Sequence, residues 1–185
     1  GVADPGPSNG GASQRSPNRL DVDVIRRAVL WDRTDVKDAT LSLAALAAFE
    51  AATTDGRFPC DVTLVLTDDS EVRQLNRTWR DVDAPTNVLS FPSGEPVGEM
   101  QGEPRPLGDV VLAGETVLKE AGLKGVSVPD HVSHLVVHGV LHLLGHDHEQ
   151  DADAERMEAL ETKILAGLGI ADPYAEAGAA AEVSP

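Results

Sequence analysis

Cysteine, basic charge and long apolar runs are all scarce in this 185-residue chain. Its one cysteine, Cys60, excludes an internal disulfide and fits the reducing cytoplasm. Because Cys60 opens an apolar run, we predict a buried thiol on a strand. The chain has no run of about 18 apolar residues, which excludes a helix that spans a membrane. Its first residues show no charged stretch followed by an apolar one, so no secretory signal is expected.

Basic residues are few beside acidic ones. The chain has 15 Lys and Arg against 31 Asp and Glu, which gives a formal net charge of −16. Such a charge repels polyanions at long range and argues against a non-specific nucleic-acid binder. A local basic groove can still exist on an acidic protein, so the charge alone does not exclude a nucleic-acid substrate.

The pattern of apolar and turn-forming residues predicts one domain between two tails. Residues 1–20 are rich in Gly, Pro, Ser and Asn and are predicted to be a disordered N-terminal tail. Residues 175–185 are predicted to be a C-terminal tail, which leaves a single domain at 21–174. Strands are expected at 20–25, 60–67, 88–91 and 107–113, and helices at 41–52, after 68–69, and at 115–121, 130–144 and 151–168. Because these elements do not alternate strictly, we predict an α+β fold, with a small mixed sheet of about four strands and helices packed on it.

Three histidines of one segment are predicted to bind a metal ion. His138 and His142 are four residues apart on an expected helix, so their side chains lie on one face, one turn apart. Gly145 lets the chain turn back with a positive φ and present His148 to the same ion. Three imidazoles and one open position are typical of catalytic zinc, so we predict one Zn²⁺ per chain, although other divalent metals could bind.

The same spacing, H-x-x-x-H-x-x-G-x-x-H, is that of the metzincin proteases. Their general-base Glu follows the first histidine, and this chain has Gly139 at that position. Without the carboxylate, peptide hydrolysis loses its proton acceptor. The sequence therefore predicts the metal-binding part of such a site without the protease machinery.

The other histidines receive different predictions. His134 lies four residues before His138 on the same helical face, and we predict a catalytic role for it, as a proton shuttle, a contact to substrate or a partner behind the ligands. A fourth metal ligand is the other alternative, but His134 is two turns from His142, which makes binding of the same ion awkward. His131 and His146 are predicted to be ordinary surface residues.

Several separated motifs carry a resemblance to a known family. They are H-G-x-L-H-L-x-G-y-D-H at 138–148, and the segments 75–80, 85–92, 107–111, 157–161, 168–169 and 172–174. In this order they resemble the YbeY family of bacterial endoribonucleases, the rRNA maturation factors, over roughly residues 21–174. The chain has His146 and Trp79 where the family more often has Tyr.

This resemblance implies a small α+β domain with the metal in a cleft between the sheet and the helices, beside a central helix. It implies that the three histidines bind zinc, that Arg80 is important for activity, and that the substrate is single-stranded RNA. The family is implicated in maturation of the 3′ end of small-subunit rRNA and in ribosome quality control. The small ribosomal subunit or its proteins are therefore the expected partners, in the cytoplasm.

Arg80 has a physical reason to act on a phosphodiester. A guanidinium matches phosphate geometry through two parallel hydrogen bonds and stays charged at any working pH. Arg73 and Arg77 precede it at helical spacing, so the three could form a positive strip. Two other functions stay open: a metallohydrolase of another bond, and a ribosome assembly factor whose metal is structural.

Overall fold

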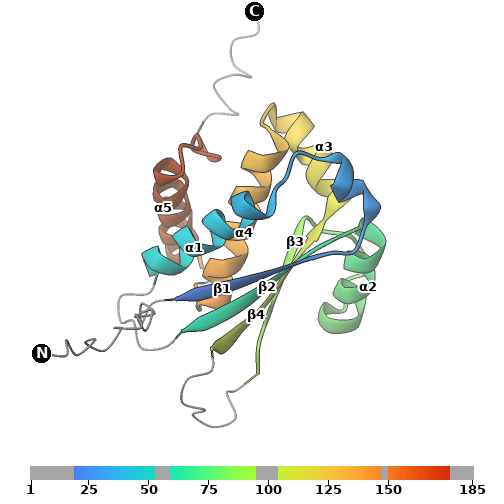
Figure 1. Cartoon of the computed structure of the whole chain (residues 1–185), viewed down its shortest axis with the longest axis horizontal. Helices are drawn as coiled ribbons and strands as arrows, with labels where there is room; N and C mark the ends of the chain where they lie inside the picture. The colour runs from blue at the N-terminus through green and yellow to red at the C-terminus, as the bar shows by residue number, and fades with distance from the viewer. Residues whose placement is uncertain (1–18, 53–58, 95–103, 147–149, 176–185) are drawn as a thin grey trace, which may run out of the picture.

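The computed structural model describes residues 19–52, 59–94, 104–146 and 150–175, and Figure 1 shows a twisted sheet with helices on both faces. Within these ranges the sheet has four strands in the order β1-β2-β4-β3, with β1, β2 and β4 parallel and β3 antiparallel to β4. The strands are β1 Leu20–Arg26, β2 Cys60–Thr67, β3 Val88–Pro92 and β4 Arg105–Ala113. The helices are α1 Asp38–Ala52, α2 Asp69–Arg80, α3 Gly114–Lys124, α4 Val128–Leu143 and α5 Asp151–Gly167. The predicted α+β class and mixed sheet are confirmed.

Alternating apolar residues give the sheet two buried faces. One face belongs to the larger core, which includes α1 and α4, through fully buried residues of β2 and β4: Val62, Leu64, Leu66, Val110 and Leu112. On the opposite face, Val65 and Val111 pack with Val72 of α2 in a smaller cluster. Each large aliphatic side chain buried in this way contributes about 1.5–3 kcal/mol. The larger core therefore holds α4 on the sheet.

Helix α4 is the central helix, and its close approach to the sheet positions the candidate site. It begins before the predicted position, so the hydroxyl of Ser127 caps it, accepting from the backbone N–H of Asp130 at 3.2 Å. Gly139 faces β3 and β4, where a Cβ would lie 2.6 Å from a methyl carbon of Val110 and 3.1 Å from Oγ of Ser90. A glycine is therefore needed for α4 to lie this close to the sheet.

Two local features differ from the sequence-based expectations. A 3-10 helix, Val29–Arg33, follows β1 and buries Trp31, whose indole N–H donates to the Thr67 carbonyl at 2.8 Å. The helix expected at 115–121 continues as α3 through Gly122 and stops at Gly125, which has a φ of 67°. A glycine inside a helix costs only about 1 kcal/mol, so Gly122 does not end the helix.

The remaining expectations on chain organisation lie partly inside the described ranges. Cys60 is 8% exposed at the start of β2, so the predicted buried strand thiol is confirmed, and burial raises the pKa of this thiol. Strand β1 already begins at Leu20, the last residue of the predicted N-terminal tail. The rest of the two predicted tails lies outside the described residues, apart from Arg19 and Ala175. No helix in the described ranges combines the length and apolar character needed to cross a membrane.

Candidate active site

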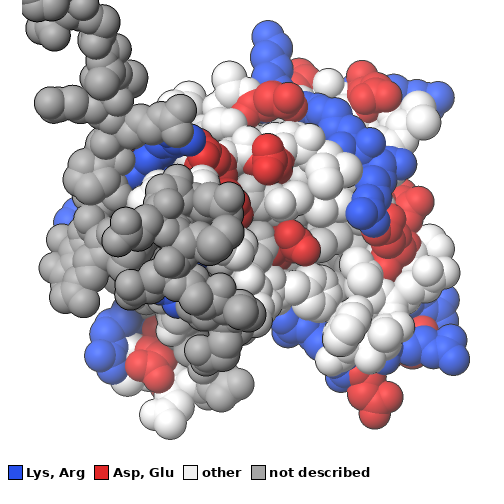
Figure 2. Space-filling view, turned by 60° about the horizontal axis from the view of Figure 1, so that its bottom comes forward, with Lys and Arg blue, Asp and Glu red and all other residues white. Residues whose placement is uncertain are grey.

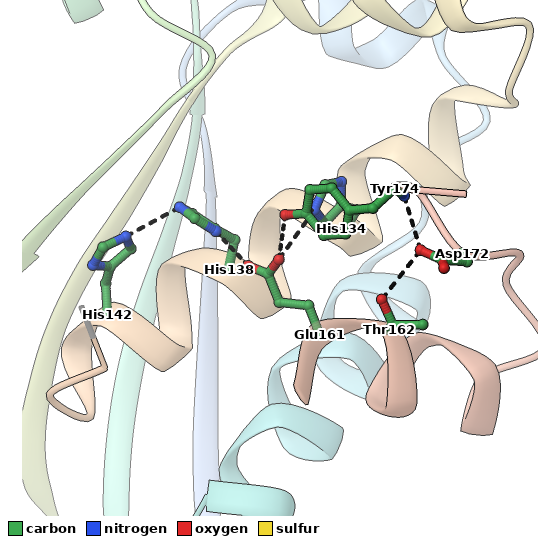
Figure 3. Close-up of polar contacts among 7 residues, drawn as sticks. All are labelled: His134, His138, His142, Glu161, Thr162, Asp172 and Tyr174. Atoms are coloured by element: carbon green, nitrogen blue, oxygen red, sulfur yellow. Dashed lines mark hydrogen bonds and ion pairs between the residues drawn. The ribbon is translucent and has the colours of Figure 1, made fainter. Parts of the chain in front are cut away.

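His138 and His142 lie one turn apart near the C-terminal end of α4, and one ring nitrogen of each points toward the other (Figure 3). The two Nε2 atoms are 3.0 Å apart. Two nitrogens bound to one tetrahedral zinc, each at 2.0–2.1 Å, would lie about 3.3 Å apart. The imidazoles are therefore close to ligating geometry. No group of three metal-binding side chains occurs within the described residues, and the predicted third ligand, His148, lies outside them.

A buried carboxylate from α5 stands behind His138. Glu161 is fully buried, and it is hydrogen-bonded to Nδ1 of His138 and to the hydroxyl of Tyr174 (Figure 3). Burial alone would raise the pKa of Glu161, but contacts with His134, His138 and Tyr174 outweigh it and lower that pKa to about 2. Burial and the bond to Glu161 also raise the pKa of Tyr174 well above its usual range. At neutral pH Glu161 is therefore a carboxylate and Tyr174 a phenol.

The charge on Glu161 fixes the direction of the hydrogen bonds around it. An ionised carboxylate only accepts, so Nδ1 of His138 and the Tyr174 hydroxyl both donate to it. Since the phenol proton points to Glu161, the Tyr174 oxygen accepts from Nε2 of His134, 3.2 Å away. Neutral His138 therefore has its lone pair on Nε2, facing His142. Nδ1 of His134 is buried without a hydrogen-bond partner in the described part of the chain.

A pocket of about 490 Å³ joins the two imidazoles to Arg80. Arg80, the last residue of α2, donates from Nη2 to the Ser90 carbonyl at 3.0 Å, and its guanidinium carbon lies 5.9 Å from the centre of the Phe91 ring. The other described residues that line the pocket are uncharged: Asn76, Val82, Thr86, Asn87, Val88, Leu89, Ser90 and Pro92. The described lining therefore carries one permanent cation and no carboxylate, which suits an anionic substrate.

The predicted strip of Arg73, Arg77 and Arg80 includes one arginine that is paired with a carboxylate. Arg73 donates to both carboxylate oxygens of Asp83, at 2.7 and 3.2 Å, and this pairing lowers the pKa of Asp83. Arg80 is the member of the strip that lines the pocket. On the face in Figure 2, Lys and Arg side chains lie in separate groups, with Asp and Glu side chains next to them. Positive charge thus reaches the pocket through Arg80.

Comparison with known proteins decides the family. The family model described as endoribonuclease YbeY matches residues 30–169. The chain belongs to the YbeY endoribonuclease family. Among relatives named endoribonuclease YbeY, that of Bradyrhizobium diazoefficiens is 49% identical over 162 residues, 86% of this chain and 88% of the relative. That of Azorhizobium caulinodans is 54% identical over 161 residues, 84% of this chain and 97% of the relative. A solution structure from Thermotoga maritima aligns at 20% identity and a TM-score of 0.48, over 84% of this chain and 100% of that one.

This YbeY-family chain thus brings Arg80, His138 and His142 into one pocket. Gly145 has the positive φ expected at the turn toward His148, 96°. The individual roles of these side chains in binding and catalysis stay predictions.

His134 takes a different position from the other predicted site residues. It is 7% exposed and lines a second cavity of about 290 Å³, together with residues 170–173 and His131. It is not among the residues that line the Arg80 pocket. Its Nε2 lies 3.6 Å from the Glu161 carboxylate, so it is connected to His138 through that side chain. A catalytic role for His134 stays a prediction. Its contacts favour a role in supporting the metal ligand His138 over a role as a proton shuttle.

Sequence reasoning assigned no role to Glu161 or Tyr174. Both fall in motifs that carry the family resemblance, at 157–161 and 172–174, and this was the available signal. A helical glutamate in a charged segment usually faces solvent. Its burial depends on three polar partners from other parts of the chain, which spacing within α5 does not reveal.

A second set of contacts behind the pocket joins α4 to α3, and one of its residues contradicts a prediction. His131, predicted on the surface, is 2% exposed, so that prediction was wrong. Its Nε2 lies 3.0 Å from Glu120, which also accepts from the side-chain amide of Asn87 at 3.0 Å. Burial is the main cause of the lowered pKa of His131. The contact with Glu120 compensates the cost of burying the His131 ring. The same carboxylate holds Asn87 in place at the wall of the pocket.

Proposed function

We propose that this chain is an endoribonuclease that hydrolyses phosphodiester bonds of single-stranded RNA with a bound zinc ion. One observation carries the proposal: Nε2 of His138 and Nε2 of His142 converge to 3.0 Å at a pocket that also contains Arg80. The relatives named endoribonuclease YbeY support the reaction class.

The donor set fits zinc. Zinc binds the neutral imidazole nitrogen, and His138 offers its Nε2 lone pair because its Nδ1–H is bound to Glu161. With His148 as the predicted third ligand, such a site keeps one position for water or substrate. Other divalent ions that accept imidazole also fit. When bound, the metal would supply an activated water and polarise a phosphoryl oxygen.

Arg80 would bind the phosphate and stabilise the extra negative charge of the transition state. One of its N–H groups donates to the Ser90 carbonyl, and its plane lies near Phe91, so the guanidinium is held before substrate arrives. The uncharged lining around it provides little competition from protein carboxylates.

Gly139 argues against peptide hydrolysis at the same site. The metzincin base would occupy this position, and here the position packs against Val110 and Ser90 without room for a Cβ. A guanidinium beside the imidazoles serves a phosphodiester better than a peptide bond.

We further propose that the substrate is ribosomal RNA, with roles in maturing the 3′ end of small-subunit rRNA and in ribosome quality control. The family resemblance supports this assignment, with the cytoplasm as the location. A net charge of −16 gives little long-range attraction to RNA. Delivery of the substrate by the small ribosomal subunit or one of its proteins fits that charge.

The proposal is tested by measuring zinc content and cleavage of a single-stranded RNA oligomer in wild type and His142→Ala. We expect wild type to carry about one zinc per chain, to lose cleavage on chelation and to recover it with added zinc. His142→Ala should bind zinc poorly and cleave at least ~1,000-fold more slowly, since a catalytic metal contributes several kcal/mol.

The matched control is His146→Tyr, the residue that the family more often has there, which should keep zinc and cleavage. Full zinc content and full cleavage in His142→Ala would contradict the metal assignment. Cleavage of peptides but not RNA would favour another metallohydrolase. Binding of ribosomal particles without any nuclease activity would favour an assembly factor.

A further inference from the structure

We propose that Glu161 is a positioning residue of the metal centre, which holds the proton of His138 on Nδ1 and so directs its Nε2 lone pair toward His142. This inference rests on the zinc site proposed above, and it assigns a role to a side chain from a different helix, 23 residues further along the chain. Glu161 does not line the pocket and acts through His138.

The burial of Glu161 is the first support. A fully buried carboxylate is costly unless its oxygens are bound. Here one oxygen binds His138 Nδ1 and the other binds the Tyr174 hydroxyl, with His134 Nε2 at 3.6 Å. A carboxylate held only to connect α4 and α5 could bind any donor of α4. This one binds the ring whose other nitrogen faces the pocket.

The imidazole tautomer is the second support. A neutral imidazole has one N–H and one lone pair, and the hydrogen bond at one nitrogen decides the state of the other. With Nδ1–H donated to Glu161, the lone pair lies on Nε2, which is 3.0 Å from Nε2 of His142. In the other tautomer, Nε2 of His138 would carry the proton and would have no lone pair to offer to an ion.

The segment after α5 holds Glu161 in turn. Oδ1 of Asp172 accepts from the backbone N–H of Tyr174 at 2.8 Å and from the hydroxyl of Thr162 at 3.1 Å (Figure 3). These bonds place the phenol so that its hydroxyl donates to Glu161, while its oxygen accepts from His134. His134 and Tyr174 therefore limit the motion of the carboxylate that orients His138.

The test uses the full chain in four forms: wild type, Glu161→Gln, Tyr174→Phe and the control Glu155→Gln. The control makes the same change at an exposed position of the same helix. Two quantities are measured: the zinc dissociation constant, by competition with a chromophoric chelator, and the ¹⁵N chemical shifts of the His138 ring in the metal-free protein at neutral pH. Circular dichroism checks that each form is folded.

We expect wild-type His138 to carry its proton on Nδ1 before metal is added. Glu161→Gln should weaken zinc binding by about 10–100-fold, the usual effect of changing a partner behind a ligand. The neutral amide oxygen can still accept from Nδ1–H but holds that proton less strongly than a carboxylate does, so the Nδ1–H state should be less populated. Tyr174→Phe should weaken binding less, and Glu155→Gln should match wild type.

A folded Glu161→Gln protein with wild-type zinc affinity would overturn the proposal, as would a wild-type His138 protonated on Nε2. If Glu161→Gln does not fold, unchanged zinc affinity in Tyr174→Phe would overturn it, and a weakened affinity there would support it. Absence of zinc binding in wild type would instead refute the metal site itself, while the metal-free ring shifts still report on Glu161.

Discussion

The two nitrogens of the His138 ring lie in opposite surroundings. One nitrogen faces the pocket, where it can bind a metal ion, and the other is held by the protein. On the pocket side its Nε2 meets His142, and the described lining of that pocket contains Arg80 and no carboxylate. On the α5 side its Nδ1 meets Glu161, which also binds Tyr174 and is fully buried (Figure 3). The pocket side is open to a substrate, whereas the α5 side is satisfied by the protein itself. RNA cleavage should therefore depend most on residues of the pocket side, and the orientation of the His138 ring on residues of the α5 side.

After the loss of the ligand His142, the largest expected effect lies at Arg80, also on the pocket side. Arg80→Lys keeps the charge and removes the planar pair of donors, so we expect kcat/KM for single-stranded RNA to fall about 100-fold. Zinc content should not change, because Arg80 acts on substrate. Arg77→Lys, on the same helix but outside the pocket, is the control and should cleave normally. Equal activity of Arg80→Lys and wild type would remove Arg80 from the site.

An intermediate effect is expected where α4 meets the sheet. Gly139→Ala places a methyl group 2.6 Å from a Val110 methyl carbon, and this overpacking should lower the free energy of unfolding by about 1–3 kcal/mol. Urea denaturation measures the change. Gly122→Ala is the matched control, since nothing lies within 4 Å of its Cβ position inside α3, and it should raise stability by up to about 1 kcal/mol. A Gly139→Ala protein as stable as wild type, or more stable, would contradict the close contact.

The smallest effect is expected on the α5 side, at its exposed end. Thr162→Val removes the hydroxyl that donates to Asp172 and should lower the free energy of unfolding by about 0.5 kcal/mol or less. Zinc affinity and RNA cleavage should stay within experimental error, because Asp172 still accepts from the Tyr174 backbone. A loss of zinc binding as large as that in Glu161→Gln would show that the two sides are not separable.

Local patterns predicted the elements that carry the ligands. The four strands and five helices lie near their expected positions, and the spacing of His138 and His142 placed both on one face of α4. Arg80 came from the family resemblance and from phosphate chemistry. These features depend on periodicity within one segment, which a sequence displays directly.

Features that depend on distant partners could not be predicted in this way. Glu161 and His131 read as polar residues of solvent-exposed helix faces, and each is buried by partners on another helix. Trp31 lies in a 3-10 turn too short to give a periodic signal, and Thr67 of β2 supplies its hydrogen-bond acceptor. Such positions are set by the packing of elements against one another.

Ser90 on the edge strand β3 contacts both parts of the pocket. Its carbonyl accepts from Arg80, and its hydroxyl donates to the carbonyl of Gly139, the residue that follows His138. One residue thus sets the spacing between the guanidinium and the imidazoles before any substrate is present. A phosphate must fit within the distance between the guanidinium and the imidazoles. A shift of β3 along α4 would change that distance.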